Sequence, residues 1–261
     1  MDNNLLVRLF GFPATLIHWD PMVLDRWRWL NVRFPHGQPR LDILDVGCGG
    51  GAFTIGLARR GHTTIGLTFD GTSHCHAVER ARLCHASTAS FRICDVRHLD
   101  AASDLRGRFD TVICLECIEH ILDDAKLMRD MAACLKPGGR LLLTSPNADY
   151  IPITPGDAGP FWPVETGWHV RKGYTAARLH EFCAGVGLTP RHVTFCSGFL
   201  SQKLTWGLRT LGRRNHLLGW AAILPLRWIP PLIDGVVSRL TNWPGYSICL
   251  EADKPPGAPP P

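Results

Sequence analysis

An α/β fold with a mostly parallel sheet is the class of structure that the sequence predicts. From residue 41 onward, short apolar runs of strand length alternate with segments of helical periodicity. This alternation is typical of βαβ units, in which a helix crosses over between two parallel strands. Glycine or acidic residues follow the first three runs, and parallel sheets bind ligands beyond the carboxyl ends of their strands. The sequence therefore predicts a ligand site at that edge.

The composition is that of a globular protein. The 261 residues are 45% hydrophobic and 20% charged, with a mean hydropathy near zero, which excludes a largely disordered or collagen-like chain. A chain of this length can bury a full core. No stretch of about 18 consecutive apolar residues is present, so no spanning helix is expected. The N-terminus lacks the pattern of a secretory signal.

The ten cysteines are expected to be free thiols. Without a secretory signal they indicate a reducing compartment, and we expect a cytoplasmic protein. Cys114 and Cys117 form a CxxC pair, but no second pair at similar spacing completes a zinc site. The sequence therefore favours core packing for the cysteines and predicts no metal centre.

Residues 1–40 are predicted to form an N-terminal helical cap. A helix over 21–34 follows Asp20, a favourable N-cap residue, and has a proline in its first turn. Trp27 and Trp29 are expected to pack this helix on the core rather than to cover a ligand.

Residues 41–197 are predicted to form the α/β core. Gly61 and Gly187 end two of its helices, and the KPGG sequence at 136–139 is expected to separate a helix from the next strand. The predicted helices are 52–60, 72–84, 123–135 and 174–186. The predicted strands are 41–46, 63–68, 91–94, 109–115, 140–144 and 191–196.

Three further segments complete the predicted organisation. A loop rich in proline and glycine, 152–168, is expected to be a lid or a binding loop. An apolar and basic insertion, 198–243, precedes the final strand within 244–254. Residues 255–261 are predicted to be a disordered tail.

The glycine-rich run DVGCGGG at 45–51 closes the first strand and opens a helix. Glycines permit a tight turn and close approach of a ligand to the backbone, and the helix N-terminus adds unpaired N–H groups. Gly47, Gly49 and Ala52 also match the dinucleotide pattern G-x-G-x-x-A. The loop alone does not separate NAD from another nucleoside.

Acidic residues at three strand ends favour a cationic nucleoside. Asp45 would repel a pyrophosphate but could hold an ammonium group, directly or through water. Asp70 could bind ribose hydroxyls, and Asp95 could accept from an adenine amino group. The alternatives are structural: Asp70 could cap the following helix, and Asp95 could be a solvated loop residue.

Residues 41–145 resemble the class I S-adenosylmethionine-dependent methyltransferases. Four motifs carry the resemblance: LDILDVGCGGG at 41–51, CDV at 94–96, FDTVICLECIEHILD at 109–123 and LKPGGRLLLTSPN at 135–147. The resemblance implies a Rossmann-like sheet of seven strands, with the last strand reversed and helices on both faces. It also implies S-adenosylmethionine as the cofactor.

The resemblance also implies a set of cofactor-binding residues. The glycine loop would hold the methionine part of the cofactor, the residues after the third strand the adenine, and those after the fourth strand the rest of the cleft. At the end of the second strand, where the family usually has an acidic residue, this chain has a threonine, as do enzymes resembling cyclopropane fatty acid synthases. The implied residues are Asp45, Gly47, Cys48, Gly49, Gly51, Thr68 or Asp70, Asp95, Val96, Leu115 and Glu116.

Two histidines are candidates for a general base. His120 follows the fourth strand, and His169 ends the proline- and glycine-rich loop. The IEHILD and SPN segments, with a later histidine before a helix, are similar to ubiquinone-pathway O-methyltransferases. A base assists transfer to an oxygen of high pKa, and histidine suits neutral pH. Alternatively, each histidine only holds its turn or loop in place.

The insertion carries the charge asymmetry of the chain. Residues 1–150 hold 17 basic and 17 acidic residues, whereas 151–261 hold 11 and 6. On a helix over 200–214, four leucines share one arc and four basic residues lie opposite. These are Leu200, Leu204, Leu208 and Leu211, against Lys203, Arg209, Arg213 and Arg214. A lid with its leucines packed inward is favoured over a membrane contact through 200–233.

The function predicted is methyl transfer to a hydroxyl group of a hydrophobic or amphipathic small molecule, such as a lipid, quinone, glycoside or secondary metabolite. No nucleic-acid partner is expected, because stacking aromatic residues do not alternate with the arginines. Three alternatives stay open: a carbon-methylating or cyclopropane-forming enzyme, an NAD-dependent oxidoreductase, and a non-catalytic membrane-associated binder.

Overall fold

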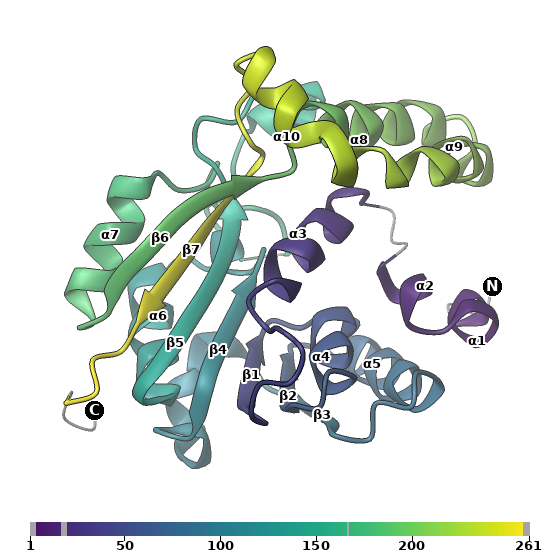
Figure 1. Ribbon diagram of the computed structural model, residues 1–261. Helices are drawn as coiled ribbons and strands as arrows, with labels where there is room; N and C mark the ends of the chain where they lie inside the picture. Colours follow the sequence, from purple (N-terminus) through teal and green to yellow (C-terminus); the bar gives the residue numbers. More distant parts are fainter. Residues whose placement is uncertain (1–3, 17–19, 166, 258–261) are drawn as a thin grey trace.

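A single twisted sheet of seven strands forms the centre of the molecule (Figure 1). The computed structural model describes residues 4–16, 20–165 and 167–257. The strands are β1 (Asp42–Val46), β2 (Thr63–Thr68), β3 (Ala89–Ile93), β4 (Phe109–Leu115), β5 (Leu135–Pro146), β6 (Thr189–Cys196) and β7 (Ser247–Asp253).

The strand order confirms the predicted α/β class. The order is β3-β2-β1-β4-β5-β7-β6, and β1 to β5 pair in parallel. Strand β7 runs antiparallel to both β5 and β6. Because the chain order reverses between β1 and β4, the loops after these two strands diverge and leave a crevice at their carboxyl ends.

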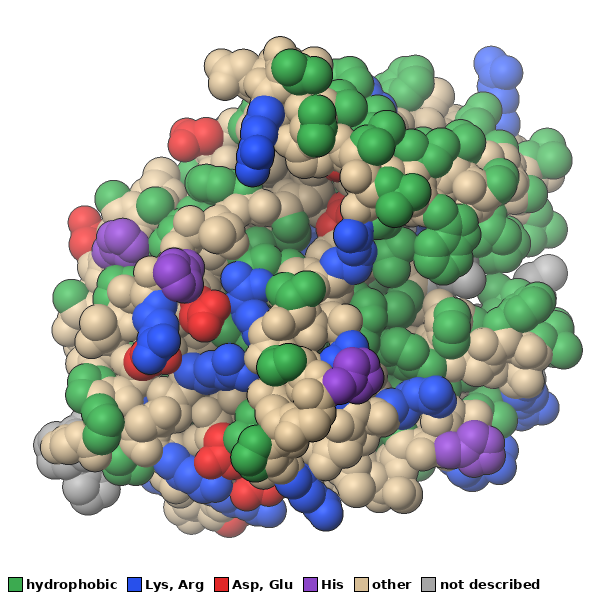
Figure 2. All heavy atoms as spheres, viewed as in Figure 1, with side chains coloured by type: hydrophobic (Ala, Val, Ile, Leu, Met, Phe, Trp, Pro, Cys, Tyr) green, Lys and Arg blue, Asp and Glu red, His purple; other side chains and the backbone are tan. Residues whose placement is uncertain are grey.

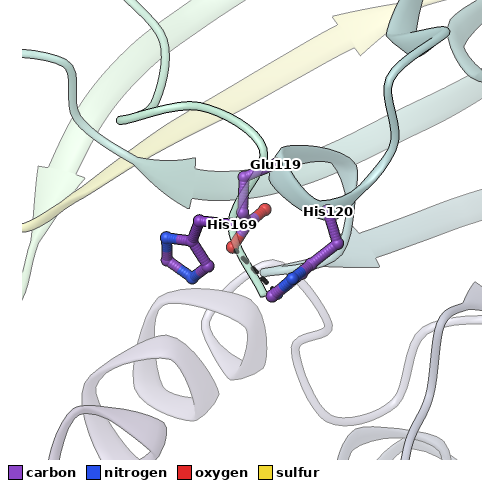
Figure 3. A group of neighbouring side chains, drawn as sticks. All are labelled: Glu119, His120 and His169. Carbon is purple, nitrogen blue, oxygen red and sulfur yellow. Dashed lines mark ion pairs between the residues drawn. The ribbon is translucent and has the colours of Figure 1, made fainter. Parts of the chain in front are cut away.

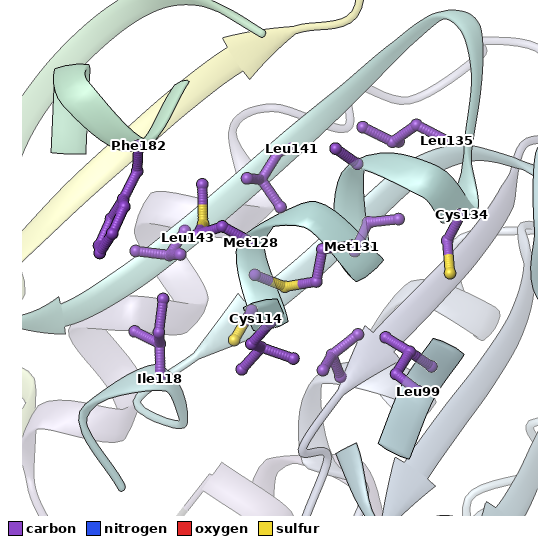
Figure 4. Packing of buried hydrophobic residues seen from close by; sticks show 14 of the residues in the cluster. Leu99, Cys114, Ile118, Met128, Met131, Cys134, Leu135, Leu141, Leu143 and Phe182 are labelled. Carbon is purple, nitrogen blue, oxygen red and sulfur yellow. The ribbon is translucent and has the colours of Figure 1, made fainter. Parts of the chain in front are cut away.

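Helices cover both faces of the sheet, as the alternation of apolar side chains requires. On β4, Val112 and Cys114 pack in one core cluster and Ile113 in the other, because successive side chains of a strand point to opposite faces. Figure 4 shows α6 over the first cluster. The helices of the core are α4 (Ala52–Ala58), α5 (Gly71–Leu83), α6 (Asp124–Cys134) and α7 (Ala176–Gly185).

The N-terminal segment forms three helices, α1 (Leu5–Phe10), α2 (Phe12–Leu16) and α3 (Met22–Asn31). The Asp20 carboxylate accepts a hydrogen bond from the backbone N–H of Met22 at 2.9 Å, at the predicted start of α3. Trp29 packs in the core, as expected, and Trp27 packs edge-on against Phe12. The sequence analysis did not predict α1 and α2.

Strand β5 is longer than predicted, because it includes the KPGG sequence that was expected to lie outside it. Pairing with β4 begins at Phe109 and Leu135, and the register shifts before Thr111. Gly138 takes a left-handed backbone at φ 78°. A Cβ on Gly139 would lie 2.9 Å from the carbonyl oxygen of Lys136. The glycines thus form an irregularity within the strand rather than a break before it.

The insertion between β6 and β7 is a helical bundle of α8 (Phe199–Gly212), α9 (His216–Ile223), the short 3-10 helix η5 (Leu224–Trp228) and α10 (Pro230–Leu240). The prediction that the leucine arc of α8 packs inward is wrong in part. Its buried side is mostly small and polar, including Ser201 and Thr205, whereas Leu211 is 46% exposed. Close contacts with α10, where Asp234 accepts from the backbone at the start of α8, favour small and polar side chains there.

Among the described residues, no single helix has both the length and the apolar character to cross a membrane. The segments Leu217–Trp228 and Pro230–Leu240 meet those criteria only together, as a pair bent by 80°. The predicted tail lies partly outside the described residues, which end at 257.

A glycine in β2 gives the first test of this packing. A Cβ on Gly66 would lie 2.8 Å from Cys48 Sγ and from a ring carbon of Phe91. We expect Gly66→Ala to lower the free energy of unfolding by about 1–3 kcal/mol through overpacking. Gly185→Ala in α7, where no atom lies within 4 Å, is the matched control and should change it by less than about 1 kcal/mol. Urea unfolding of both variants measures the difference, and equal stabilities would contradict the contact.

Candidate active site

The glycine loop after β1 has the backbone needed to approach a ligand closely. Gly47, Gly49 and Gly51 take left-handed backbone angles, with φ of 81°, 50° and 78°, which glycine adopts at little cost. The N–H of Cys48 donates to the carbonyl of Leu67 at 2.7 Å and ties the loop to β2. A Cβ on Gly49 would meet no atom within 4 Å. The loop therefore leaves open space on its outer side.

Asp45 lies beneath this loop rather than in the crevice. Its side chain is buried, and it accepts a hydrogen bond from the Thr54 hydroxyl at 2.6 Å. Burial raises the pKa of the Asp45 carboxyl from 3.8 to about 7. A cation bound at the loop would favour the ionised form of this carboxyl.

The two candidates after β2 have different surroundings. Thr68 is buried at the end of the strand. Asp70 is exposed and accepts from the backbone N–H of Ser73 at 2.8 Å, so it caps α5. This hydrogen bond lowers the pKa of the Asp70 carboxyl. The capping alternative for Asp70 thus holds in the structure. Thr68, which ends β2 itself, is the other candidate for the ribose.

Asp95 follows β3 and is already paired. Its carboxylate accepts from the Arg97 guanidinium at 2.6 Å and from the backbone N–H of Arg97 at 3.0 Å. These bonds lower the pKa of the Asp95 carboxyl. Val96 begins the 3-10 helix η1 (Val96–Ala101) and packs in the core, as does Leu115 in the opposite cluster. Because both side chains are buried in the core, only the backbones of Val96 and Leu115 are left to contact a ligand.

Glu116 anchors a buried polar network at the end of β4. It takes an uncommon left-handed backbone at φ 52°. Its Oε1 accepts from the hydroxyls of Thr144 and Ser247, both at 3.0 Å, and its Oε2 pairs with Arg26 at 3.1 Å. Arg26 also pairs with Asp20 at 2.9 Å. Although burial opposes the charge, these two carboxylates raise the pKa of Arg26.

Three side chains converge next to this network (Figure 3). Glu119 and His120 come from the 3-10 helix η3 (Ile118–His120), and His169 comes from the loop after β5. The imidazole rings of His120 and His169 lie 4.7 Å apart, edge to face. His120 Nε2 lies 4.0 Å from Glu119 Oε1, an oxygen with no hydrogen-bond partner among the described residues.

Burial shifts these three groups toward their neutral forms. Burial and the Glu116 carboxylate raise the pKa of Glu119. Burial lowers the pKa of His120, and burial together with His120 lowers the pKa of His169 to about 4. Both imidazoles are therefore uncharged near pH 7. A proton taken up by His120 would sit beside the unpartnered Glu119 oxygen.

The same three side chains also form a set that could hold a metal ion, although the sequence predicted none. Their ligand atoms all lie within 4.8 Å of one another. Two imidazoles and a carboxylate are a donor set found around zinc and non-haem iron. The sequence does not point to this set, because only the complete burial of Glu119 in the folded chain brings its carboxylate against two histidines.

The loop after β5 contacts the site, and its role as a lid or binding loop stays a prediction. The backbone N–H of Val170 donates to the carbonyl of Glu119 at 3.0 Å. Glu165 accepts from Arg97 at 3.0 Å, so one guanidinium binds both the loop and Asp95. At its other end, Asp157 pairs with Arg209 of α8 at 2.8 Å.

Arg26 is a buried residue of the site that the sequence did not predict. It lies on the same face of α3 as Met22, Trp29 and Leu30, all of which are buried. A charged residue at helical spacing within an apolar face signals a buried ion pair. That signal was available, but its partner Glu116 is distant in sequence.

A glycine loop over a buried carboxylate at the switch point of a seven-stranded sheet, with β7 reversed, defines a class I S-adenosylmethionine-dependent methyltransferase. The family model described as a methyltransferase domain matches residues 19–193. The chain belongs to this family. Its cofactor is S-adenosylmethionine, and the open, left-handed glycine loop above Asp45 fits that group.

The relatives are consistent with this assignment. The chain is 33% identical over 172 residues to a ubiquinone biosynthesis O-methyltransferase of Albidiferax ferrireducens, covering 64% of this chain and 66% of that protein. It is 29% identical over 160 residues to the enzyme of the same name from Aeromonas salmonicida, covering 58% and 64%. The chain thus spans less than two thirds of the length of these curated relatives.

Solved structures share the fold. A sarcosine dimethylglycine methyltransferase from Galdieria sulphuraria, described as putative, is 15% identical with a TM-score of 0.62, covering 90% of this chain and 86% of that one. The cyclase SpnF is 22% identical with a TM-score of 0.61, covering 90% and 83%. At these identities the likeness concerns the fold alone. The comparisons do not favour the NAD-dependent alternative.

The raised pKa of Asp45 predicts a pH dependence of stability. The folded-state pKa lies above the ordinary value, so the contribution of Asp45 is greatest below about pH 4 and is lost as the pH rises through about 7. Asp45→Asn keeps an oxygen that accepts from Thr54 and does not ionise. We expect the melting temperature of the variant, relative to wild type, to rise between pH 5 and pH 8.

Differential scanning calorimetry of the two proteins without cofactor measures this difference. Thr54→Val removes the hydroxyl donor and leaves Asp45 able to ionise. As the control, this variant should lose stability more steeply than wild type as the pH rises. A difference between Asp45→Asn and wild type that is constant from pH 5 to pH 8 would show that Asp45 does not titrate there.

Proposed function

We propose that this chain transfers a methyl group from S-adenosylmethionine to a hydroxyl oxygen of a hydrophobic or amphipathic small molecule. The observation that carries the proposal is the pair of neutral imidazoles beside buried Glu119. Glu119 and His120 follow β4, next to Leu115 and Glu116, which are expected to line the cofactor. Relatives named ubiquinone biosynthesis O-methyltransferases support oxygen as the acceptor atom.

In this proposal His120 is the general base. The cofactor supplies a methyl group on a positively charged sulfur, a centre open to displacement by an oxygen nucleophile. Neutral His120 accepts the hydroxyl proton through one ring nitrogen. The resulting imidazolium lies 4.0 Å from Glu119 Oε1 and favours the ionised form of that carboxyl. His169 is the weaker base, since its pKa is lowered to about 4, and it positions the acceptor next to His120.

The network around Arg26 holds this machinery in place. Glu116 receives hydrogen bonds from Thr144 of β5 and Ser247 of β7, and an ion pair from α3. Helix α3, β5 and the start of β7 are thereby joined to the end of β4 beside η3. The covering loop excludes water from the same region, which favours transfer to the acceptor over side reactions.

Substitution of the two histidines tests the base. We expect His120→Ala to lower kcat by about 100-fold or more, the usual contribution of a general base, and His169→Ala to lower it less. Both variants should bind S-adenosylmethionine with the wild-type Kd in calorimetry. His180→Ala, an exposed histidine on α7, is the matched control with unchanged kcat.

The assay uses methyl-labelled S-adenosylmethionine with a hydroxylated quinol that bears a hydrocarbon tail, and mass spectrometry of the product. A new methyl ether supports the proposal, whereas a new carbon–carbon bond would replace it with carbon methylation. If neither histidine variant slows turnover, the assignment of a base is wrong. Loss of activity after dialysis against a chelator, restored by a divalent metal, would assign the three-residue cluster to a metal ion instead.

We also propose that segment 200–233 contacts a membrane surface and that the protein is cytoplasmic. Figure 2 shows hydrophobic side chains gathered over the insertion and the N-terminal helices. Trp228 and Leu232 are 58% and 79% exposed, and Leu240 beyond the segment is 82% exposed. Exposed apolar side chains beside basic ones are typical of interfacial helices. All ten cysteines are free thiols, which supports a reducing compartment.

Vesicle binding tests the membrane contact. We expect wild-type protein to co-sediment with anionic phosphatidylglycerol vesicles, and Trp228→Asp with Leu232→Asp to reduce the bound fraction at least several-fold. Ala177→Asp with Ala184→Asp, at two exposed positions of α7, adds the same charge away from the insertion and should leave binding unchanged. Equal binding by all three proteins would contradict a contact through this segment.

A further inference from the structure

An apolar groove lies between the N-terminal helices and the insertion, away from the histidine cluster. Its volume is about 610 Å³, within the range of small-molecule sites. Nine of its eleven lining residues are apolar, and the other two are Arg28 and Arg227. One wall is the edge-to-face pair of Phe12 and Trp27, and the opposite wall is η5 with the start of α10.

Arg227 is the unusual member of this lining. Arg227 is only 5% exposed, and its three guanidinium nitrogens have no hydrogen-bond partner among the described residues. Arginine is rarely buried without a partner, because removing a charge from water is costly. The guanidinium presents several donors that match a carboxylate or a phosphate group.

Asp20 does not neutralise Arg227. It acts on Arg227 only through long-range attraction, and the ion pair that Asp20 makes is with Arg26. The Asp20 carboxylate is occupied, since it accepts from Arg26 at 2.9 Å and from the N–H of Met22 at 2.9 Å. The groove lining contains no acidic residue. A bound anion would therefore complete an ion pair that the chain leaves open.

The shape of the walls indicates what the rest of the ligand is made of. Gly56 of α4 allows the wall to sit close to the core, because a Cβ there would lie 2.4 Å from the Trp27 ring. Trp228 and Leu232, on the opposite wall, are exposed toward the open side of the groove. Aromatic and aliphatic walls around a single buried cation suit a hydrocarbon chain with an acidic head.

We propose that this groove binds an amphipathic anion, with its carboxylate or phosphate head on Arg227 and its hydrocarbon chain along the wall formed by Phe12 and Trp27. Exposed Arg28 lies at the rim and provides a second, weaker positive charge. The ligand is either a free single-chain amphiphile or a lipid presented by a bilayer, since both offer the same head and chain. The site is separate from the proposed methyl transfer and does not depend on it.

Binding of monomeric probes tests the site directly. Dodecyl phosphate and dodecanoate, each below its micelle concentration, are titrated while tryptophan fluorescence and the melting temperature are followed. We expect both probes to raise the melting temperature of wild-type protein by several degrees. Dodecyl maltoside, which has the same chain and no charge, should bind at least tenfold more weakly.

Arg227→Met separates a ligand site from a structural role. The methionine keeps the apolar stem and removes the unpaired charge, so the protein without ligand should melt at or above the wild-type temperature, and the shift caused by dodecyl phosphate should be lost. Arg227→Lys should retain part of the shift. Arg213→Gln, at an exposed arginine of the same insertion, should behave as wild type.

Phosphatidylglycerol and phosphatidylcholine vesicles distinguish the two sources. Loss of phosphatidylglycerol binding in Arg227→Met, but not in Arg213→Gln, supports a bilayer lipid. Loss of dodecyl phosphate binding with unchanged vesicle binding supports a free amphiphile. The proposal is overturned if wild type binds neither probe nor vesicle, if Arg227→Met responds like wild type, or if Arg227→Met melts well below wild type while Arg227→Lys does not, since Arg227 would then stabilise the fold.

Discussion

The buried ion pair between Arg26 and Glu116 is the interaction on which the arrangement of the site depends. It joins helix α3, near the start of the chain, to the end of the central strand β4. The same carboxylate receives hydroxyl groups from β5 and β7. Burial of a guanidinium is costly unless it is paired, and Asp20 supplies the second carboxylate for Arg26. The N-terminal cap is therefore part of the active-site wall and not a separate appendage.

Burial also sets the chemistry beside this pair. It pushes the pKa of Glu119 up and those of His120 and His169 down, so that a carboxyl group and two imidazoles lie together with little net charge. Burial makes each imidazole a weaker base than it would be in water, and a proton or cation that does bind there favours the ionised form of Glu119. The unpartnered oxygen of Glu119 is where that charge is balanced.

The sequence predicted the features that local rules control. Alternation of short apolar runs and helical segments predicted the strands, and the glycine run at 45–51 predicted the left-handed loop, because both depend on neighbours in the chain. Arg26 and Glu119 were missed because their roles depend on partners or burial that only the folded chain supplies. The prediction that the leucine arc of α8 packs inward follows a rule for helices that lie on a large core. Here the helix packs on α10 through small and polar side chains instead.

Arg97 connects two parts of the site. One guanidinium holds both Asp95, which follows β3, and Glu165, in the loop after β5. A ligand that donates hydrogen bonds to Asp95 would weaken one hold on Arg97 and leave its guanidinium free to bind Glu165 more tightly. Binding of a ligand at Asp95 and the position of the loop after β5 would in this way be coupled through a single side chain.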